Sequence, residues 1–332
     1  MQAITFSEYG GPEVFKLSEV AKPAPTENEV LIKIFSTAVN SADYRIRSAN
    51  PWLVRLAFGF FKPRISILGG VFSGVIESVG TGVTKYKVGE EVFGSTGMTG
   101  AGAYAEYKCL SENDVFTTKP KNLSHGEAST ITFGGLTALY FVQKANIQKG
   151  QKVLVYGASG SVGTSIVQIA KYYGAEVTGV CSTKNLELVK SLGASSVIDY
   201  TKEDFTKNGV EYDVVFETVD KISIETGLKA LKPNGTLYLI SAMPGGDTFK
   251  ALWMSLTGKQ KIVSGTFPEK TESLIFLKKL VESGDLKAVV DKTYDLADMV
   301  EAHKYVDTGH KAGNVSILVC NISPFDTLRP LK

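Results

Sequence analysis

The clearest motif that could do chemistry is a glycine-rich loop, Gly157-Ala-Ser-Gly-Ser-Val-Gly163, between an apolar run and a helical pattern. Its glycines permit a tight turn, close approach of a ligand to the backbone, and close packing of a helix on a strand. The free N–H groups and the dipole at a helix N-terminus attract anions. The spacing is GxxGxxG, and a glycine turn that serves only packing is the alternative. Inside a run of βα units, the loop predicts a dinucleotide pyrophosphate site.

The segment after the second strand of this run indicates which dinucleotide is bound. Enzymes that use NAD carry an acidic residue about 20 residues past the loop, where it holds the ribose 2′-hydroxyl. Here the sequence reads Gly179-Val-Cys-Ser-Thr-Lys-Asn185, without an acid. A carboxylate would repel a 2′-phosphate, whereas Ser182 and Lys184 can bind one. This favours NADPH; the alternative for Lys184 is a solvated lysine at a helix start.

Metal-binding patterns are missing from the sequence. The three histidines, His125, His303 and His310, do not share metal-ligand spacing. The three cysteines, at positions 109, 181 and 320, form no CxxC pair. We therefore expect no bound metal, no disulfide framework and a reducing compartment.

The elements that must position the loop follow from hydrophobic periodicity. After residue 123, short apolar runs alternate with helical patterns, which is typical of a doubly wound parallel sheet. Strands are expected at 152–156, 176–181, 196–200, 212–217, 236–241 and 261–266, and helices at 161–173, 185–192, 224–231 and 272–283. A turn is expected at Pro233-Asn234-Gly235.

The two ends of the chain have a β-type texture. Residues 1–120 contain short strand-like runs at 29–35, 71–76 and 91–93, separated by turn residues. Strand patterns return at 289–296 and 314–319, around a helical pattern at 298–306. We expect this last stretch to pack back onto the first domain.

Composition narrows the class of protein. The 332 residues are 43% hydrophobic and 21% charged, which suits two globular domains. With 36 basic and 34 acidic residues, nothing indicates a nucleic-acid partner. The most apolar stretch, 52–61, is far shorter than the ~20 residues that span a bilayer. No integral membrane segment and no signal peptide are expected, which favours a cytoplasmic protein.

Several short motifs together resemble the medium-chain dehydrogenase/reductase superfamily, in its zinc-independent quinone oxidoreductase and enone reductase branch. They are Gly11-Pro-Glu-Val14, Glu29-Val-Leu-Ile32, Val39-Asn-Ser-Ala-Asp43, Gly74-Val-Ile-Glu-Ser-Val-Gly80, Val88-Gly-Glu-Glu-Val-Phe-Gly94, Gly135-Leu-Thr-Ala138, the loop at 157–163 and Leu192-Gly-Ala194. The resemblance implies an α/β protein with a GroES-like β domain, residues 1–122 with 268–332, and a Rossmann domain, residues 123–267.

The positions of zinc ligands in this superfamily are changed. Zinc-dependent relatives place a Cys where this chain has Asn40, a His-Glu pair at Gly70-Val71, and a further Cys within 131–134. None of these ligands is present, so the resemblance implies catalysis without zinc.

The resemblance also implies the residues that contact the cofactor. The pyrophosphate would meet Ser159, Gly160, Ser161 and Val162; the adenosine end Ser182, Lys184 and Tyr200; and the nicotinamide side Thr218, Ile240 and Phe267. Asn40 would face the nicotinamide ribose, and His310 would lie on a loop over the cofactor. Tyr200 and Thr218 are alternatively strand-end residues, His310 a loop histidine, and Asn40 and Asp43 helix caps; for Asp43 we expect the cap.

A site without a metal ion constrains the acceptor. Reducing a plain ketone leaves an alkoxide without a cation to stabilise it. A quinone or an α,β-unsaturated carbonyl spreads the arriving charge, so we expect a small, hydrophobic, electrophilic substrate of this kind. Tyr44 is the candidate hydrogen-bond donor to the oxyanion, with packing as the alternative. Reduction of ordinary carbonyls through a side-chain acid and a non-catalytic NADPH-binding role remain alternatives.

An apolar insert, Pro51-Trp-Leu-Val-Arg-Leu-Ala-Phe-Gly-Phe-Phe-Lys-Pro63, is the most unusual local feature. It is interpreted as a lid or wall for a hydrophobic substrate, as a membrane-surface contact, or as a helix buried at a subunit or domain contact. The resemblance further implies a homodimer joined edge to edge through strand 261–266; a monomer with that edge covered is the alternative.

Overall fold

The computed structural model describes residues 1–97, 101–241 and 259–320. Contacts divide the chain into two compact units, which are described separately. Unit 1 comprises residues 1–133, 270–278 and those from 290 onward; unit 2 comprises 134–269 and 279–289. Residues 321–332, the end of the first predicted domain, lie outside the described residues.

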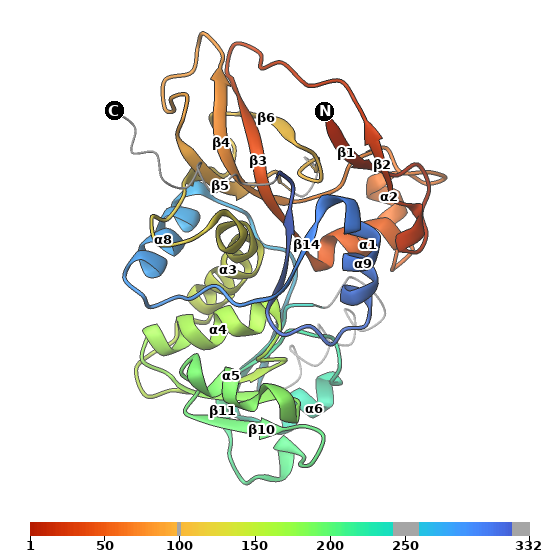
Figure 1. Cartoon of the computed structure of the whole chain (residues 1–332). Coiled ribbons are helices and arrows are strands. Elements are labelled where there is room, and N and C mark those ends of the chain that lie inside the picture. The colour runs from red at the N-terminus through yellow and green to blue at the C-terminus, as the bar shows by residue number, and fades with distance from the viewer. Residues whose placement is uncertain (98–100, 242–258, 321–332) are drawn as a thin grey trace. The chain divides into compact units, whose positions relative to one another are not determined.

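Unit 1 is built on a β-sheet that combines both ends of the chain (Figure 1). Its strand order is β14-β15-β3-β4-β5-β7, with β6 also paired to β3. The strands are β3 (Glu29–Val39), β4 (Val71–Val79), β5 (Glu91–Ser95), β6 (Tyr107–Ser111), β7 (Phe116–Thr118), β14 (Val290–Asp295) and β15 (Asn314–Leu318). Because β15 pairs antiparallel with β3, the C-terminal strands extend the N-terminal sheet, as the β-type texture of both ends predicts.

Short helices and a two-stranded ribbon complete unit 1. The ribbon pairs β1 (Gln2–Thr5) with β2 (Lys16–Glu19). The helices are α1 (Ser41–Ser48), α2 (Val54–Phe58) and α9 (Met299–Asp307), with 3₁₀ turns at Pro12–Val14 and Leu296–Asp298. The core contains Ile32, Phe72, Tyr104, Phe116 and Ile317, all nearly inaccessible to solvent.

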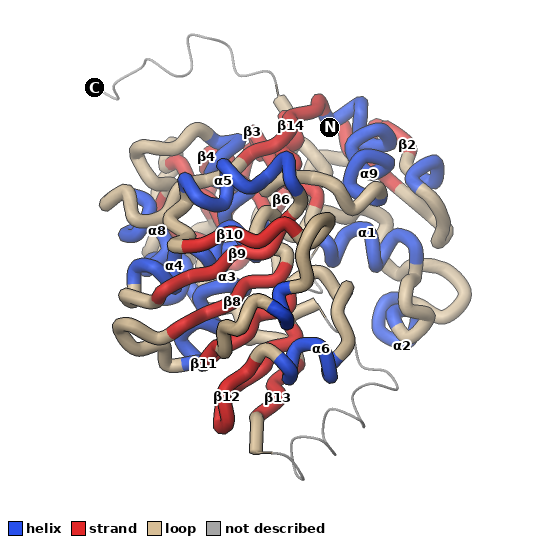
Figure 2. The backbone as a smooth tube through the Cα atoms, turned by 90° about the horizontal axis from the view of Figure 1, so that it is seen from below, coloured by secondary structure: helices blue, strands red, loops and turns tan. Residues whose placement is uncertain are grey.

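Unit 2 contains the predicted doubly wound sheet. Six parallel strands follow the order β10-β9-β8-β11-β12-β13, side by side in Figure 2. They are β8 (Lys152–Tyr156), β9 (Glu176–Cys181), β10 (Ser196–Asp199), β11 (Tyr212–Glu217), β12 (Leu231–Leu239) and β13 (Lys261–Ser264). The chain order reverses at β8, which lies between β9 and β11. Such a reversal is where α/β sheets bind nucleotides, at the carboxyl ends of the strands.

Helices connect these strands. They are α4 (Ser161–Tyr172), α5 (Leu186–Ser191) and α6 (Ile224–Lys229), with 3₁₀ turns at Thr183–Asn185 and Phe205–Lys207. Two further helices, α3 (His125–Ala145) and α8 (Thr271–Glu282), have residues in both units. The predicted α/β class with a doubly wound parallel sheet is confirmed.

The expected turn at 233–235 lies within a strand rather than before one. β12 begins at Leu231, opposite Tyr212, and its pairing resumes at Thr236 opposite Val214. The residues between form an irregularity in which Asn234 has φ +72. Asparagine tolerates this left-handed conformation, so the turn residues are accommodated as a local bulge.

Candidate cofactor-binding site

The loop between β8 and α4 assigns a different role to each glycine. Gly157 has φ +83, and a Cβ there would lie 2.6 Å from Thr218 Oγ1. A Cβ on Gly163 would lie 2.1 Å from the carbonyl oxygen of Gly157, so this glycine permits close packing of α4 on the loop. At Gly160 a Cβ would meet only the Gly157 oxygen, at 3.5 Å. The protein itself leaves space over Gly160, at the N-terminus of α4, where a phosphate would bind.

A polar cluster connects this loop to the end of β9. The amide Nδ2 of Asn185 donates to Ser159 Oγ at 3.0 Å and to Ser182 Oγ at 3.3 Å. Asn185 is 8% exposed, whereas both serines are partly accessible. The predicted pyrophosphate residue and the predicted adenosine residue therefore lie side by side. Asn185 was not among the predicted site residues, although it stands in the segment that suits a 2′-phosphate.

A buried acid also lies at this end of the sheet. Asp199 pairs with Cys181 across β10 and β9 and accepts hydrogen bonds from Thr183 Oγ1 and, at 2.7 Å, from Thr201 Oγ1. The Thr183 hydroxyl lowers the pKa of Asp199 to about 2. Its negative charge is therefore held by hydroxyl donors and by Lys202, at 3.6 Å. Asp199 ends β10 rather than β9, and only strand pairing brings it beside the end of β9, so the sequence around β9 gives no sign of it.

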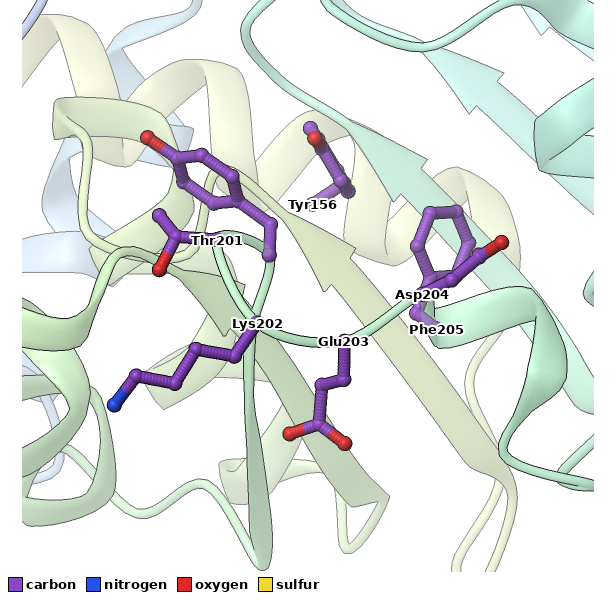
Figure 3. A pocket seen from close by; sticks show the side chains of 7 residues that line it. Tyr156, Thr201, Lys202, Glu203, Asp204 and Phe205 are labelled. Atoms are coloured by element: carbon purple, nitrogen blue, oxygen red, sulfur yellow. The ribbon is translucent and has the colours of Figure 1, made fainter.

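Tyr200 follows β10 and borders a cavity of about 400 Å³ (Figure 3). Its ring centroid is 6.4 Å from that of Tyr156, which is 5.5 Å from that of Phe205. The remaining lining residues are Thr201, Lys202, Glu203 and Asp204. Tyr200 is 48% exposed, so its ring offers an aromatic surface on which a flat base can stack. Lys184 lies on the 3₁₀ turn after β9 and is exposed.

Three predicted nicotinamide-side residues follow β11, β12 and β13. The hydroxyl of Thr218 donates to the carbonyl oxygen of Tyr156 at 2.8 Å, which ties the end of β11 to the glycine loop. Ile240 follows β12 and donates its N–H to the backbone carbonyl oxygen of Glu217 at 2.9 Å. The Phe267 ring lies 6.1 Å from that of Tyr140. The Thr218 hydroxyl therefore has a structural role at the end of its strand, as the alternative interpretation expects. The same oxygen, together with a methyl group of Val219, also leaves no room for a side chain at Gly157.

In unit 1, Asn40 carries a buried donor that has no acceptor. It precedes α1, and its backbone N–H donates to Asp43 Oδ2 at 2.9 Å. Asp43 therefore has the capping role that we expect. The Asn40 side chain is 4% exposed, and its Nδ2 has no hydrogen-bond partner among the described residues. Because buried polar groups are normally paired, this amide is suited to meet a ligand oxygen.

A series of buried, hydrogen-bonded side chains leads away from Asp43. Arg47 Nη1 donates to His303 Nδ1 at 3.0 Å, so Nε2 carries the histidine proton and lies 3.2 Å from the Tyr104 hydroxyl. Tyr104 in turn hydrogen-bonds Asp43. Burial raises the pKa of Asp43 to about 6 and lowers that of His303 well below its usual value. The series ends nearer the surface in an ion pair between Arg47 and Asp307, at 2.6 Å.

The two remaining predicted site residues of unit 1, Tyr44 and His310, are not part of this series of hydrogen-bonded side chains. Tyr44 is partly buried and packs against the core of unit 1, as its alternative role requires. His310 is exposed on the loop after α9, where its N–H donates to Thr308 Oγ1 at 3.3 Å. Next to it, Lys311 Nζ donates to the carbonyl oxygen of Gly313 at 2.6 Å, and burial lowers its pKa to about 8. Sequence reasoning did not single out Lys311.

The described residues contain neither a cluster of metal ligands nor a helix that could span a membrane. Within 1–97, 101–241 and 259–320, no group of three or more His, Cys, Asp or Glu side chains could hold a metal ion. Over the same ranges, no helix has both the length and the apolar character that crossing a bilayer requires.

Comparisons with known proteins agree with this geometry. Residues 26–121 match the alcohol dehydrogenase GroES-like domain, and residues 192–317 match the zinc-binding dehydrogenase family. A 2-methylene-furan-3-one reductase from Solanum lycopersicum is 34% identical over 96% of this chain and 79% of that protein. The quinone oxidoreductase of Coxiella burnetii superposes with TM-score 0.86, at 28% identity over 96% of this chain and 99% of that one. The Escherichia coli quinone oxidoreductase, solved with NADPH, gives TM-score 0.82 at 25% identity over 96% and 100%.

The fold and the glycine loop define an oxidoreductase with a GroES-like domain and a Rossmann-like nucleotide-binding domain. The chain belongs to the quinone oxidoreductase and enone reductase branch of the medium-chain dehydrogenase/reductase superfamily. The resemblance inferred from the short motifs is confirmed.

Proposed function

We propose that this protein transfers hydride from NADPH to quinones or α,β-unsaturated carbonyls without a metal ion. The observation that carries the proposal is the open space over Gly160 at the N-terminus of α4, beside a hydroxyl-rich and amide-rich cluster. Relatives of this branch are named for reduction of a conjugated ketone and of quinones, and one is solved with NADPH.

The residues present fit the cofactor. Loop N–H groups at 159–162 would hold the pyrophosphate, Ser182 and Lys184 the 2′-phosphate, and Tyr200 the adenine face. The Asn40 amide would donate to the nicotinamide ribose. When bound, NADPH supplies the hydride. Thr218, Ile240 and Phe267 would form the nicotinamide side, and His310 would lie over the cofactor.

The residues at the positions of the superfamily's zinc ligands indicate which kind of acceptor this protein reduces. Asn40, Gly70 and Val71 stand where zinc-dependent relatives carry ligands, and none of them is a Cys, His or Glu. No bound cation would then stabilise an alkoxide, so the acceptor itself must delocalise the charge. The chain's part is to position the acceptor, exclude water and, through Tyr44, donate a hydrogen bond to the conjugated oxygen.

NADPH oxidation measured with a panel of acceptors tests this function. We expect turnover with a quinone or a conjugated enone, at unchanged rate after treatment with a chelator. Turnover of a saturated aldehyde would favour the ordinary carbonyl reductase. Tight NADPH binding without turnover of any acceptor would favour a non-catalytic role.

Assembly and location complete the proposal. β13 is the edge strand of the described sheet, so a second copy could pair with it and form a homodimer. Cys109, Cys181 and Cys320 are free thiols, which suits the reducing cytoplasm. Sedimentation velocity would test the dimer: a monomer at concentrations well above those of the assay would exclude it.

A further inference from the structure

Unit 1 exposes a group of large apolar side chains in one short segment, residues 52–64. Trp52, Leu56, Phe60 and Phe61 are 61%, 58%, 56% and 89% exposed. In the described part of the chain ten large hydrophobic residues are at least 38% exposed, and four of them lie in ten consecutive positions. Scattered apolar residues on a surface are ordinary, but such a concentration indicates a contact surface.

The backbone holds these side chains outward. Val54 is buried in the core of unit 1 and anchors α2. After the helix, the Tyr9 hydroxyl donates to the carbonyl oxygen of Gly59 at 2.7 Å, and Arg64 N–H donates to that of Phe58 at 2.7 Å. Gly59 has φ +124, and a Cβ there would lie 2.1 Å from the Lys62 oxygen. A tight, fixed turn therefore presents Phe60 and Phe61, whose ring centroids are 5.1 Å apart.

The same segment is strongly cationic. Arg55, Lys62 and Arg64 lie among the exposed apolar residues, and the sequence has no Asp or Glu from Tyr44 to Ile76. Arg55 stacks over the Tyr9 ring at 4.8 Å and donates to the carbonyl oxygen of Phe60 at 3.3 Å. Lys62 and Arg64 are exposed and form no salt bridge within the described residues. Their charge is therefore directed at solvent or at an anionic partner.

We propose that the 52–64 segment docks this protein on the surface of a bilayer that contains anionic phospholipid. Aromatic side chains settle at the interface between headgroups and acyl chains, while Lys and Arg reach the headgroup phosphates. The charge identifies the occupant. A second copy of this chain would bring three more cations against these, whereas an anionic leaflet neutralises them. Lipid-soluble acceptors dissolve in such a bilayer, but the docking does not depend on the proposed reaction.

Sedimentation of the full chain with vesicles tests the proposal without NADPH or an acceptor. We expect binding to phosphatidylcholine vesicles that contain phosphatidylglycerol, little binding to phosphatidylcholine alone, and loss of binding at high salt. Each Lys or Arg near such a surface strengthens binding about fivefold. The Lys62→Gln/Arg64→Gln variant should therefore bind about 25-fold more weakly. The Trp52→Ser/Phe61→Ser variant should lose binding even at low salt.

Matched controls separate docking from general charge and hydrophobicity. Lys190→Gln/Lys229→Gln removes two exposed lysines of unit 2, and Leu17→Ser/Val88→Ser removes two exposed apolar residues outside the segment. Both should bind vesicles like the parent chain, and all variants should keep its thermal unfolding midpoint, because each position is exposed. Variants of the 52–64 segment that still bind like the controls would overturn the proposal. So would a change in oligomeric state on Trp52→Ser/Phe61→Ser, which would make this face an interface between chains.

Fluorescence gives a second, local measurement. The chain has two tryptophans, Trp52 and Trp253, so Trp253→Phe leaves Trp52 as the single reporter. Its emission should shift to shorter wavelength on anionic vesicles and be quenched by brominated acyl chains. Vesicle binding without either change would place the membrane contact elsewhere and contradict the assignment.

Discussion

Asn40 illustrates how a buried donor can identify a ligand contact. Its backbone is fixed by Asp43, whereas its side-chain nitrogen meets no acceptor in the described chain. Burying such a group without a partner costs roughly 1–3 kcal/mol, so the structure tolerates a cost that a bound ligand would remove. The sequence motif suggested this role, but only the side-chain environment shows the donor to be unpaired.

Replacing Asn40 by Ala should weaken NADPH binding up to about tenfold, since one neutral hydrogen bond is lost. Ser223→Ala is the control, because it removes the hydroxyl that caps α6 by accepting from Thr226 N–H at 3.1 Å. The control should lose about 1 kcal/mol of stability and keep its affinity. Fluorescence titration with NADPH measures the affinity of both variants. An Asn40→Ala variant with the same dissociation constant as the parent chain would show that Asn40 does not contact the cofactor.

Ser182 tests the choice between the two cofactors. An aspartate there would repel a 2′-phosphate and accept from a 2′-hydroxyl. Ser182→Asp should weaken NADPH binding by about a hundredfold, because a charge-assisted contact becomes a repulsive one, and leave NADH binding unchanged or stronger. Ser191→Asp adds the same charge at the end of α5 and should change neither. An unchanged preference in Ser182→Asp would contradict the assignment of this pocket.

Two glycines of the loop between β8 and α4 affect different properties: Gly160 is expected to affect NADPH binding, and Gly163 the stability of the fold. Gly160→Ala places a methyl group where the protein leaves space, so the unfolding midpoint should hold while NADPH affinity falls about tenfold or more. Gly163→Ala forces its Cβ against the Gly157 carbonyl and should cost about 1–3 kcal/mol of stability. Calorimetry and NADPH titration of both variants distinguish these effects. Full NADPH affinity in Gly160→Ala would show that no phosphate lies over the loop.

Buried histidines make the stability of unit 1 depend on pH. Burial lowers the pKa of His125 to about 4 and that of His303 further below its usual value. As the pH falls below 6.5, these histidines bind protons in the unfolded chain but stay neutral in the folded chain. The free energy of unfolding therefore falls by about 1.4 kcal/mol per pH unit for each histidine. Asp43, with its pKa raised to about 6, binds its proton more readily when folded and opposes this loss below pH 6.

Urea unfolding at a series of pH values measures this dependence. His125→Gln should reduce the change in the free energy of unfolding between pH 6.5 and pH 6, because only one buried histidine then takes up a proton on unfolding. A free energy of unfolding that rises as the pH is lowered from 6.5 would contradict the buried neutral histidines.

The elements most readable from sequence are the central strands of unit 2. The bounds of β8, β9 and β11 agree with those expected, because short buried apolar runs flanked by turn residues leave few alternatives. β12 differs because its turn residues form a bulge inside the strand. Asp199 and Asn185 were missed because they meet the site through strand pairing and a side-chain bridge, neither of which has a sequence period.

Short motifs spread over most of the chain together indicated the family, although each motif alone would be weak evidence. The doubly wound sheet could be predicted because helices and strands alternate regularly. The β-type texture of both chain ends indicated that they pack together, but which strands pair, β15 with β3, is given only by the structure. The exposure of residues 52–64 was not predictable, since an aromatic run has the same sequence whether it faces a substrate, a membrane or a buried contact.

In the proposed reaction, hydride is transferred to a carbon atom of a conjugated acceptor, which spreads the arriving charge over its conjugated system. NADPH carrying deuterium on the hydride-donating face of its nicotinamide, incubated with the protein and an α,β-unsaturated ketone, tests this directly by NMR of the product. We expect deuterium on the β-carbon, a solvent proton on the α-carbon and an intact carbonyl. Deuterium on the carbonyl carbon, giving an unsaturated alcohol, would contradict it.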